Sequence, residues 1–424
     1  MNLEIDSAVV SRTEAVESAL PLQRTGSAVA KFVKWLDRYG EESYDFQTYY
    51  SGAVGRKAKR LYYSYPKLGT LAVLPMVFSE ALFPPGRQLF WKPQRIPIAD
   101  AHYAMGFAFL AEMSGDDRYY KRAVHFLEVL QNTRCPGYDE FTWGYPFHWE
   151  TMLGTIPPET SLITTIPYAY EAFQEVHRID GNARWRDIMH SIARHAFRDY
   201  QDVATSAKAA SCPYTPVPNH SLMVVNANAY RAYLLTNAAI EFSDRAFEES
   251  AARNLNFVLE AQNPDGSWFY ALDGKRAFID HFHTCFVLKA LAKIEALTGD
   301  SDCTSAIKRG VDYYTRNLFD DAGIPQPFSR APRLTVYRRE LYDFAECVNL
   351  AVLLRGQFPA LDNRLTVTLD QILSRWQTSD GSFRSRQLYF GWDNTPMHRW
   401  ASSQMFRSLC LLLRANDYTF PSYS

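Results

Sequence analysis

Apolar residues along most of this chain recur every three to four positions, a spacing that places them on one face of an α-helix. In the segment 27–39, for example, Phe32, Trp35 and Leu36 share a face, and Gly40 follows as a stop signal. The segment 68–83 is apolar almost throughout and reads as a buried helix that ends at a Pro-Pro-Gly sequence. The pattern predicts a protein built from helices.

From about residue 98 onward the helical segments come in pairs. The first members begin near Ile98, Thr160, Asn219, Ala277, Thr335 and Thr395, at steps of roughly 60 residues. The second members cover residues 119–131, 183–200, 244–261, 304–318 and 362–376. Independent domains have no reason to keep such a period, so the spacing indicates a repeat architecture.

The two kinds of segment differ in their pattern. First members are apolar nearly all round, as in AMGFAFLA and CVNLAVLLRG, which is typical of helices packed on every side. Second members carry one apolar stripe and a charged face, as expected for an outer layer. We therefore predict an all-α fold, an (α/α)6 toroid of six helical hairpins. The sixth outer helix is missing at the C-terminus, and segment 27–39 or 68–83 would supply it.

The predicted domain organisation follows from this ring. We expect a frayed N-terminus over residues 1–25, a single toroid domain over 26–418 and a tail over 419–424. Turns from first to second members are short, whereas the returns are long and rich in Trp, Tyr, Pro and Gly, as in RCPGYDEFTWGYPFHWETM and QNPDGSWFYALDGKRAF. The returns must all emerge on one face of the ring, which is where function is expected.

Composition and charge exclude some classes of function. Hydrophobic residues make up 47%, charged residues 21% and aromatic residues 15%, and the net charge is −1. No overall field attracts nucleic acid or an anionic membrane, and no apolar run is long enough for a membrane span. The six cysteines are scattered and read as reduced, buried thiols. The N-terminus lacks the apolar core of a secretory signal, so we expect a cytoplasmic protein.

Several motifs are absent. The sequence contains no phosphate-binding GxxxxGK[ST], no GxGxxG after a strand, no GxSxG and no HExxH. The cysteines have no metal-finger spacing. We therefore predict no cofactor and no metal.

Titratable and aromatic residues gather in the return loops and in the first turns of the inner helices. The candidate acids, bases and nucleophiles are His148, Glu150, Tyr168, His220, His283 and Glu346. The candidate substrate-binding residues are Trp91, Asp100, His102, Trp143, Tyr145, Asn226, Trp268, Asp280, Arg338, Trp392 and Arg399.

Two stretches carry most of this interpretation. The sequence WGYPFHWE at 143–150 is either an aromatic lid or a platform for a sugar, with His148 and Glu150 beside it. At the start of a predicted inner helix, Asp280 and His283 share a face at positions i and i+3, whereas His281 and His283 point apart and so disfavour a metal.

Four polar residues at the inner helices leave alternatives open. Asn226 lies in an apolar helix, where it either lines a wet cavity or bonds to a neighbouring helix. Glu346, also in an apolar helix, is either a candidate acid or base or half of a buried pair. Arg338 and Arg399 either clamp a carboxylate or phosphate or satisfy loop carbonyls.

Several of these motifs together resemble a known family. DGSWFYA followed by FIDHFHTCFVLKAL, with WGYPFHWE, ITTIPYAYEAF, VVNANAYRAYLL and PMHRWASSQMFRSL, is similar to the VpsJ-like polysaccharide-biosynthesis proteins over residues 98–413. The resemblance implies a cytoplasmic α/α-toroid associated with exopolysaccharide, capsule or lipopolysaccharide assembly. A broader likeness extends to toroidal polysaccharide lyases, glucuronyl and N-acylglucosamine epimerases and glycoside hydrolases. QNPDGSW and QTSDGSF also look like the repeat by which terpenoid cyclases join their outer helices, although DDxxD and DxDD are absent.

We expect an enzyme of surface-polysaccharide biosynthesis that modifies a glycan or a uronic-acid-containing sugar as a lyase, epimerase or glycosidase. One alternative is a non-catalytic toroid that binds a glycan or a partner, and another is a terpenoid-cyclase-like enzyme. The expected ligand is an oligosaccharide, a polysaccharide or a sugar precursor. Contact with a membrane-associated polysaccharide-synthesis complex is left open, and no nucleic acid is expected.

Overall fold

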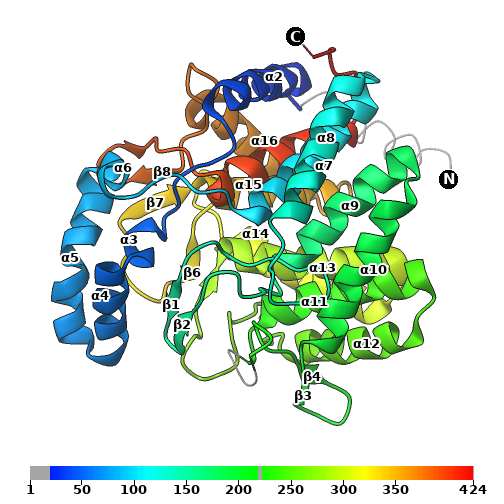
Figure 1. The fold of residues 1–424 in the computed structure, drawn as a ribbon, viewed down its shortest axis with the longest axis horizontal. Helices are drawn as coiled ribbons and strands as arrows, with labels where there is room; N and C mark the ends of the chain where they lie inside the picture. The colour runs from blue at the N-terminus through cyan, green and yellow to red at the C-terminus, as the bar shows by residue number, and fades with distance from the viewer. Residues whose placement is uncertain (1–19, 218–221, 424) are drawn as a thin grey trace, which may run out of the picture.

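The computed structural model describes residues 20–217 and 222–423, and in this part long helices form a two-layered ring (Figure 1). The inner helices are α7 (Pro97–Ser114), α9 (Ile166–Asp180), α11 (Val225–Phe242), α13 (His281–Thr298), α15 (Leu341–Leu353) and α17 (Ser403–Arg414). The outer helices are α8 (Asp117–Asn132), α10 (Ala183–Arg198), α12 (Arg245–Glu260), α14 (Ser301–Asn317), α16 (Pro359–Gln371, continued by a π-helical turn at Ile372–Trp376) and α2 (Leu22–Tyr39).

The N-terminal helix α2 closes the ring. It packs against α17, and α17 in turn packs against α7 at the start of the series. The Phe32 ring of α2 lies 5.5 Å from the ring of Phe406 and 5.2 Å from that of Phe383. The helix also begins before residue 26, and Thr25 is buried, so residues 22–25 do not belong to a frayed end. The rest of that predicted segment, residues 1–19, lies outside the described residues.

Two glutamines join neighbouring outer helices in the same way. Gln262, just after α12, donates its amide N–H to the carbonyl of Ala306 in α14 at 2.9 Å. Gln377, just after α16, donates to the carbonyl of Ala28 in α2 at 2.8 Å. The equivalence shows that α2 occupies the position next to α16 that α14 occupies next to α12.

The glycines of these two Gln-x-x-Asp-Gly-Ser turns are required by their surroundings. Gly266 and Gly381 have φ values of +91° and +98°, which favour glycine. A Cβ at Gly266 would run into the carbonyl oxygen of Arg309, and one at Gly381 into that of Lys31. The glycine of each motif thus lets the turn pack directly against the backbone of the next outer helix.

The short turns between inner and outer helices are capped by acidic or amide side chains. Asp116, Asn182, Asp244 and Asp300 each accept a hydrogen bond from a backbone N–H in the first turn of the following outer helix. A cap of this kind contributes about 1 kcal/mol to helix stability. These turns therefore fix where each outer helix begins.

Short strands precede several inner helices. The strands are β1 (Trp149–Thr151), β2 (Gly154–Ile156), β3 (Val203–Ala204), β4 (Ala210–Ser211), β5 (Ile279–Asp280), β6 (Phe328–Arg330), β7 (Tyr337–Glu340), β8 (Arg386–Leu388) and β9 (Trp392–Asp393). They pair antiparallel as β1–β2, β3–β4, β5–β6 and β7–β8–β9. Helices α13 and α15 begin later than the sequence pattern predicts. The residues directly before these two helices form β5 and β7, whose backbones pair with other strands.

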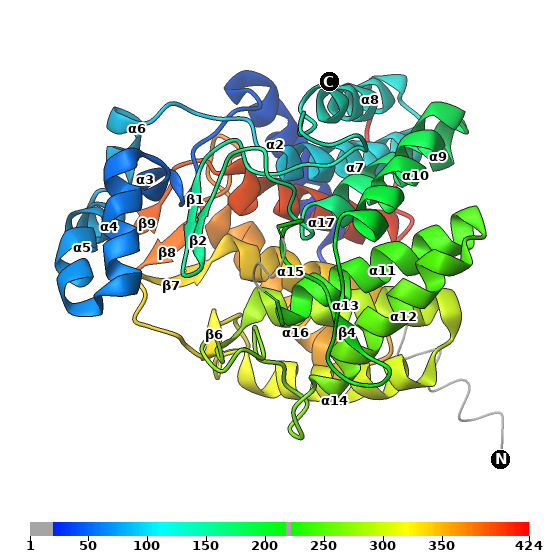
Figure 2. The same cartoon turned by 60° about the horizontal axis from the view of Figure 1, so that its bottom comes forward.

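A pair of helices lies beside the ring rather than in it (Figures 1 and 2). The segment comprises α3 (Thr48–Ser51), α4 (Ala53–Ser64), α5 (Pro66–Leu82), a 3₁₀ turn (Pro84–Gly86) and α6 (Arg87–Phe90). We call α4 and α5 the side hairpin, since they pack mainly on each other. The prediction that residues 68–83 form a buried helix is wrong, because Gly69, Val73 and Glu80 are the residues of α5 that are buried.

Two further expectations can be compared with the fold. The predicted C-terminal tail packs on the ring, where Phe420 is buried and the Tyr423 hydroxyl donates to Asp37 at 2.5 Å. All six cysteines are buried and unpaired, as predicted.

Candidate functional site

Aromatic side chains from several return loops meet at one end of the ring. The set, which we call the aromatic collar, is Tyr145, Trp149, Tyr214, Tyr270, Phe282, His283, Tyr342 and Trp400. Ring contacts connect it in the order Tyr145–Trp149, Trp149–Tyr214, Tyr270–His283, His283–Phe282, Phe282–Tyr342 and Tyr342–Trp400, with centroid distances of 4.3–5.7 Å. Arg399 stacks on both Trp400 and Tyr145 and so joins the run that ends at Tyr214 to the run that ends at Tyr270. Long loops distant in sequence therefore converge on one place.

At the start of α13, the collar residue His283 pairs with Asp280. One carboxylate oxygen of Asp280 accepts the backbone N–H of His283 at 3.1 Å, which makes Asp280 the N-cap of the helix. The other oxygen lies 2.6 Å from Nδ1 of His283. Because a carboxylate accepts, Nδ1 carries the proton and Nε2 is left as the basic nitrogen. The predicted sharing of a face by these two residues is confirmed.

His283 borders a narrow crevice of 10 Å³ that is also lined by Asn226, Trp268, Tyr270 and Asp280. This volume is close to that of one water molecule. The side-chain oxygen of Asn226 is buried and has no hydrogen-bond partner among the described residues. Burial raises the pKa of Tyr270 to about 12, so its hydroxyl stays protonated at neutral pH. The crevice thus presents a base, a free acceptor and a hydroxyl.

A second carboxyl group near this pair was not predicted. Asp343, in the first turn of α15, is buried, and no group among the described residues hydrogen-bonds to its oxygens. Burial raises the pKa of Asp343 well above its usual value, and the charges of Glu340 and Asp280 add to the effect. These effects favour the neutral, protonated form of the Asp343 carboxyl. The signal that would have found it is its position in a first turn, equivalent to that of His283.

Beneath the collar, polar groups occupy the middle of the ring. Lys289 of α13 forms a buried ion pair with Glu346 of α15, and it also donates to the Tyr168 hydroxyl at 3.3 Å. Loss of hydration lowers the pKa of Lys289 to about 8, although the carboxylate of Glu346 opposes the shift. The prediction left two roles open for Glu346, and the structure places it in a buried pair.

Further along the inner helices, the middle of the ring contains a second set of charged side chains, Glu171, Lys293 and Arg407. Burial alone would raise the pKa of Glu171, but Lys293 and Arg407 lower it below its usual value. His102 lies among these cations with its ring 4.5 Å from that of Tyr168, and burial keeps it neutral by lowering its pKa well below the usual value. The middle of the ring is charged rather than aliphatic.

Arg399 already holds a carboxylate of the protein. Its guanidinium makes two hydrogen bonds to Asp45, at 2.6 and 2.7 Å, and a third to the Tyr145 hydroxyl at 3.1 Å. It is therefore not a free clamp for a substrate. Arg338, the other predicted clamp, is exposed on β7 and stacks on Tyr389, outside the collar.

Two predicted tryptophans serve the core. The Trp143 ring is fully buried, donates its indole N–H to the carbonyl of Leu130 at 2.7 Å and cannot form an accessible platform. Trp268 is buried too and donates to the carbonyl of Val258 at 3.0 Å, although one side of it borders the crevice.

The other predicted residues are spread around the collar. Trp91 packs edge-on against Tyr49. Trp392, on β9, packs edge-on against Trp376 at the end of the π-helical turn after α16. Asp100 pairs with Arg95 at 3.0 Å, and Glu150 with Arg60 at 3.1 Å. His148 is half-buried beside the collar, and its Nδ1 has no partner among the described residues. His220 lies outside the described residues.

Two histidines of the first turns have structural roles. His281 bonds to the carbonyls of Leu318 and Gln326 and to the Tyr314 hydroxyl. In His398, Nε2 donates to the carbonyl of Gly40 at 3.0 Å and Nδ1 accepts from Tyr103 at 2.6 Å. Burial lowers the pKa of His281 to about 3 and that of His398 to about 4, so both remain neutral.

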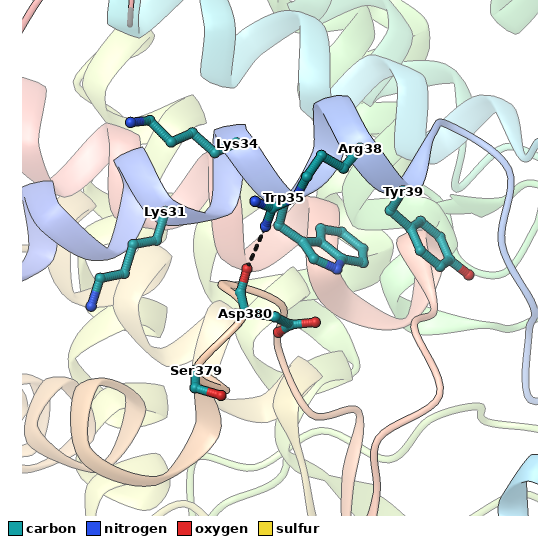
Figure 3. Close-up of a pocket in the computed structure, with 7 residues that line it drawn as sticks. All are labelled: Lys31, Lys34, Trp35, Arg38, Tyr39, Ser379 and Asp380. Carbon is teal, nitrogen blue, oxygen red and sulfur yellow. Dashed lines mark hydrogen bonds between the residues drawn. The ribbon is translucent and has the colours of Figure 1, made fainter.

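A larger hollow of 660 Å³ lies on the outside of the ring, between α2 and the turn at Asp380 (Figure 3). Lys31 and Lys34 extend away from the rings of Trp35 and Tyr39, whereas Arg38 lies beside Trp35 and already donates to the carbonyl of Asp380 at 2.9 Å. The Asp380 carboxylate is held by Thr378 and Ser382 within its own turn. The hollow lacks the convergent groups that the collar has.

Two searches of the described residues, 20–217 and 222–423, bear on other sites. They contain no group of three His, Cys, Asp or Glu side chains placed to hold a metal ion. None of their helices has the length and apolar character needed to cross a bilayer.

No protein-family model and no curated protein sequence matches this chain. Solved structures do match. An unsaturated glucuronyl hydrolase specific for heparin aligns over 95% of this chain and 99% of its own, with a TM-score of 0.63 and 10% identity. The cellobiose 2-epimerase of Bacillus thermoamylovorans B4167 aligns over 76% and 87%, with a TM-score of 0.59 and 11% identity. The GH76A α-1,6-mannanase of Salegentibacter sp. HEL1_6 aligns over 77% and 90%, with a TM-score of 0.55 and 12% identity. Identities this low show the fold alone, and the predicted all-α toroid is confirmed.

Proposed function

We propose that this protein is a carbohydrate-active enzyme of surface-polysaccharide biosynthesis that modifies a glycan or a uronic-acid-containing sugar by proton transfer. The observation that carries the proposal is the Asp280–His283 pair, which leaves Nε2 of His283 as the basic nitrogen of a residue that lines the same crevice as Asn226, whose side-chain oxygen has no partner among the described residues. Sugar rings stack on aromatic faces, and their hydroxyls need polar partners of this kind.

In the proposed reaction His283 removes the proton from the carbon next to a uronic carboxylate. Asp280 holds the imidazole in the required tautomer and stabilises the imidazolium that forms. The neutral carboxyl of Asp343 and the hydroxyl of Tyr270 are the nearby groups able to return a proton or to donate a hydrogen bond to the developing charge. This chemistry suits a lyase or an epimerase.

Three of the carboxylates that direct glycoside hydrolysis could use are already paired within the protein, and Asp280 is engaged by His283. A glycosidase needs two carboxyl groups that face each other across the substrate. Asp100, Glu150 and Glu346 are each paired with a cation of the protein, namely Arg95, Arg60 and Lys289. A terpenoid-cyclase-like function is disfavoured as well, because ion pairs rather than an apolar cavity occupy the middle of the ring.

The second candidate is a non-catalytic toroid that binds a glycan or partner. It is favoured by the carboxylates of Asp100, Glu150 and Glu346, which are each paired with a cation of the protein and so do not share a reacting atom. Either candidate requires movement of the collar, since a crevice of 10 Å³ cannot hold a sugar ring. Both candidates predict that saccharides bind at the collar, and they differ in whether His283 is needed after binding.

The test uses the purified full chain and a panel of uronic-acid oligosaccharides, neutral disaccharides and nucleotide sugars. Binding is measured by thermal shift, and reaction by NMR in deuterated water, which reports both double-bond formation and exchange of the proton at the reacting carbon. His283→Gln is expected to lower turnover by about 10²–10⁴-fold while saccharide binding is kept. The matched control is His177→Gln, a half-buried histidine in the last turn of α9, away from the collar.

Three results are decisive. Binding without turnover in the wild type supports the non-catalytic candidate. Turnover that survives His283→Gln removes this residue from the mechanism. Absence of binding to every saccharide contradicts the carbohydrate proposal altogether.

A further inference from the structure

The outer face of α5 in the side hairpin carries an apolar stripe that no part of the chain within residues 20–217 and 222–423 covers. Leu68, Leu71, Pro75, Phe78 and Leu82 recur at alternating steps of three and four residues, which aligns them along one side of the helix. Leu68 and Phe78 are 57% exposed and Leu71 and Leu82 65%. Both views show α5 at the margin of the molecule, outside the ring (Figures 1 and 2).

The apolar surface continues beyond the stripe. Val54 at the start of α4, Tyr65 between the helices, and Phe83 and Leu89 after α5 are also exposed. From Leu68 to Ser79 the chain contains no charged residue. Isolated exposed apolar side chains are ordinary, but a continuous set of this size marks a surface that contacts an apolar partner.

The side hairpin is also the most one-sided stretch of charge in the chain. Residues 46–79 contain five basic residues, Arg56, Lys57, Lys59, Arg60 and Lys67, and no acidic residue, although the whole chain has a net charge of −1. Among the described residues, Arg60 forms an ion pair with Glu150, and burial lowers the pKa of the half-buried Lys59 to about 7, which leaves Lys57 and Lys67 as exposed cations. The next acidic residue, Glu80 of α5, is buried and pairs with Arg386. The partner of the apolar face must therefore accept positive charge beside it.

We propose that the side hairpin docks the protein onto the surface of an anionic lipid bilayer. Exposed Leu and Phe side chains of α5 enter the boundary between headgroups and acyl chains, while the exposed Lys57 of α4 and Lys67 at the start of α5 lie against anionic headgroups. This is peripheral binding, since an uncharged stretch from Leu68 to Ser79 is much shorter than the roughly 20 residues needed to span a bilayer.

The charges also decide against a second copy of the chain as the occupant. A symmetric pairing of two α5 faces would bring two basic side hairpins together, and like charges at close range oppose association. An anionic bilayer meets both the apolar face and the positive charge. The inference is independent of the proposed catalysis, because no residue of the side hairpin belongs to the aromatic collar.

The experiment is co-sedimentation of the full chain with vesicles of phosphatidylcholine alone and of phosphatidylcholine with an equal amount of phosphatidylglycerol. We expect binding to the anionic vesicles, weak binding to the neutral ones, and loss of binding as salt is raised. Leu71→Glu combined with Phe78→Glu is expected to abolish binding. The matched control combines Ile240→Glu and Leu297→Glu, two similarly exposed apolar residues at the ends of α11 and α13.

A second variant separates charge from apolar insertion. Lys57→Gln with Lys67→Gln keeps the stripe and removes two exposed cations, so partitioning to anionic vesicles should fall about fivefold per cation at low salt. Circular dichroism melting checks that each variant is folded.

Several results would overturn the inference. One is a wild type that stays in the supernatant with anionic vesicles. Another is a control variant that loses binding as fully as Leu71→Glu/Phe78→Glu does. A third is a dimer, detected by light scattering, that Leu71→Glu/Phe78→Glu dissociates and vesicles do not, because the apolar face would then pair with a second copy.

Discussion

Asp280 both caps helix α13 and hydrogen-bonds Nδ1 of His283 at 2.6 Å, so a single carboxylate starts the helix and orients the imidazole of its third residue. The two roles can be separated. Asparagine is as good an N-cap as aspartate, but it lacks the charge that stabilises an imidazolium.

Substitution of Asp280 tests this double role. We expect Asp280→Asn to keep the thermal stability and to lower sugar turnover by about 10²–10⁴-fold. Asp280→Ala should lose the same activity and, in addition, about 1 kcal/mol of stability, because the cap is gone. Turnover assays with chemical denaturation measure both quantities. Equal activity of Asp280→Asn and the wild type would show that the carboxylate serves the helix alone.

The buried pair Lys289–Glu346 predicts strongly non-additive mutations. Removal of one partner leaves the other charge buried, so Lys289→Met or Glu346→Leu alone should cost about 3–5 kcal/mol. The double variant replaces both charges by apolar groups and should lose much less. A double-mutant cycle by urea denaturation measures the coupling. Additive losses would mean that the two charges do not stabilise each other.

Buried His398 predicts a loss of stability in acid. Burial lowers its pKa from 6.5 to about 4, so between these values the unfolded chain binds more protons than the folded one. Stability therefore falls as the pH is lowered from 6.5 to 4, by about 3 kcal/mol from this residue. Urea denaturation across this range should give a shallower pH slope for His398→Gln than for the wild type. An unchanged slope would assign the acid sensitivity to other groups, such as His281.

The two Gln-x-x-Asp-Gly-Ser turns predict which glycines the fold needs. Gly266→Ala and Gly381→Ala place a Cβ against a neighbouring carbonyl at positive φ, so each should destabilise the protein by several kcal/mol. Gly274 is the matched control: its φ is +72°, but no atom lies near the added Cβ. Gly274→Ala should cost about 1 kcal/mol. Thermal melting compares the three, and similar losses would exclude a role for the close approach.

Two tryptophans of the WGYPFHWE stretch should behave in opposite ways. Trp143 is buried in the core, so Trp143→Ala should cost about 3–5 kcal/mol and impair folding. Trp149 is partly exposed in the collar against Tyr145 and Tyr214. Trp149→Ala should leave the melting temperature nearly unchanged and weaken saccharide binding. Intact binding in a folded Trp149→Ala protein would remove this ring from the sugar site.

Much of the site could not be assigned from the sequence, and Arg399, Glu346 and Asp343 show why. Arg399 is held by Asp45, which is far away in the chain, and Glu346 by Lys289 on another inner helix. Neither partner follows from local spacing. Asp343 was missed because its shifted pKa depends on burial and on Glu340 and Asp280, which only the folded chain brings near it.

By itself the sequence determined what depends on neighbouring residues: the helices, the pair of Asp280 and His283, and the glutamine turns that recur with the repeat. These follow from the fixed geometry of a helix or a tight turn. The tertiary structure decided which N-terminal helix closes the ring, which charges pair in its middle, and that α5 lies outside it. An apolar helix has the same local pattern in a protein core as at a lipid surface, so its surroundings are set only by the packing of the whole chain.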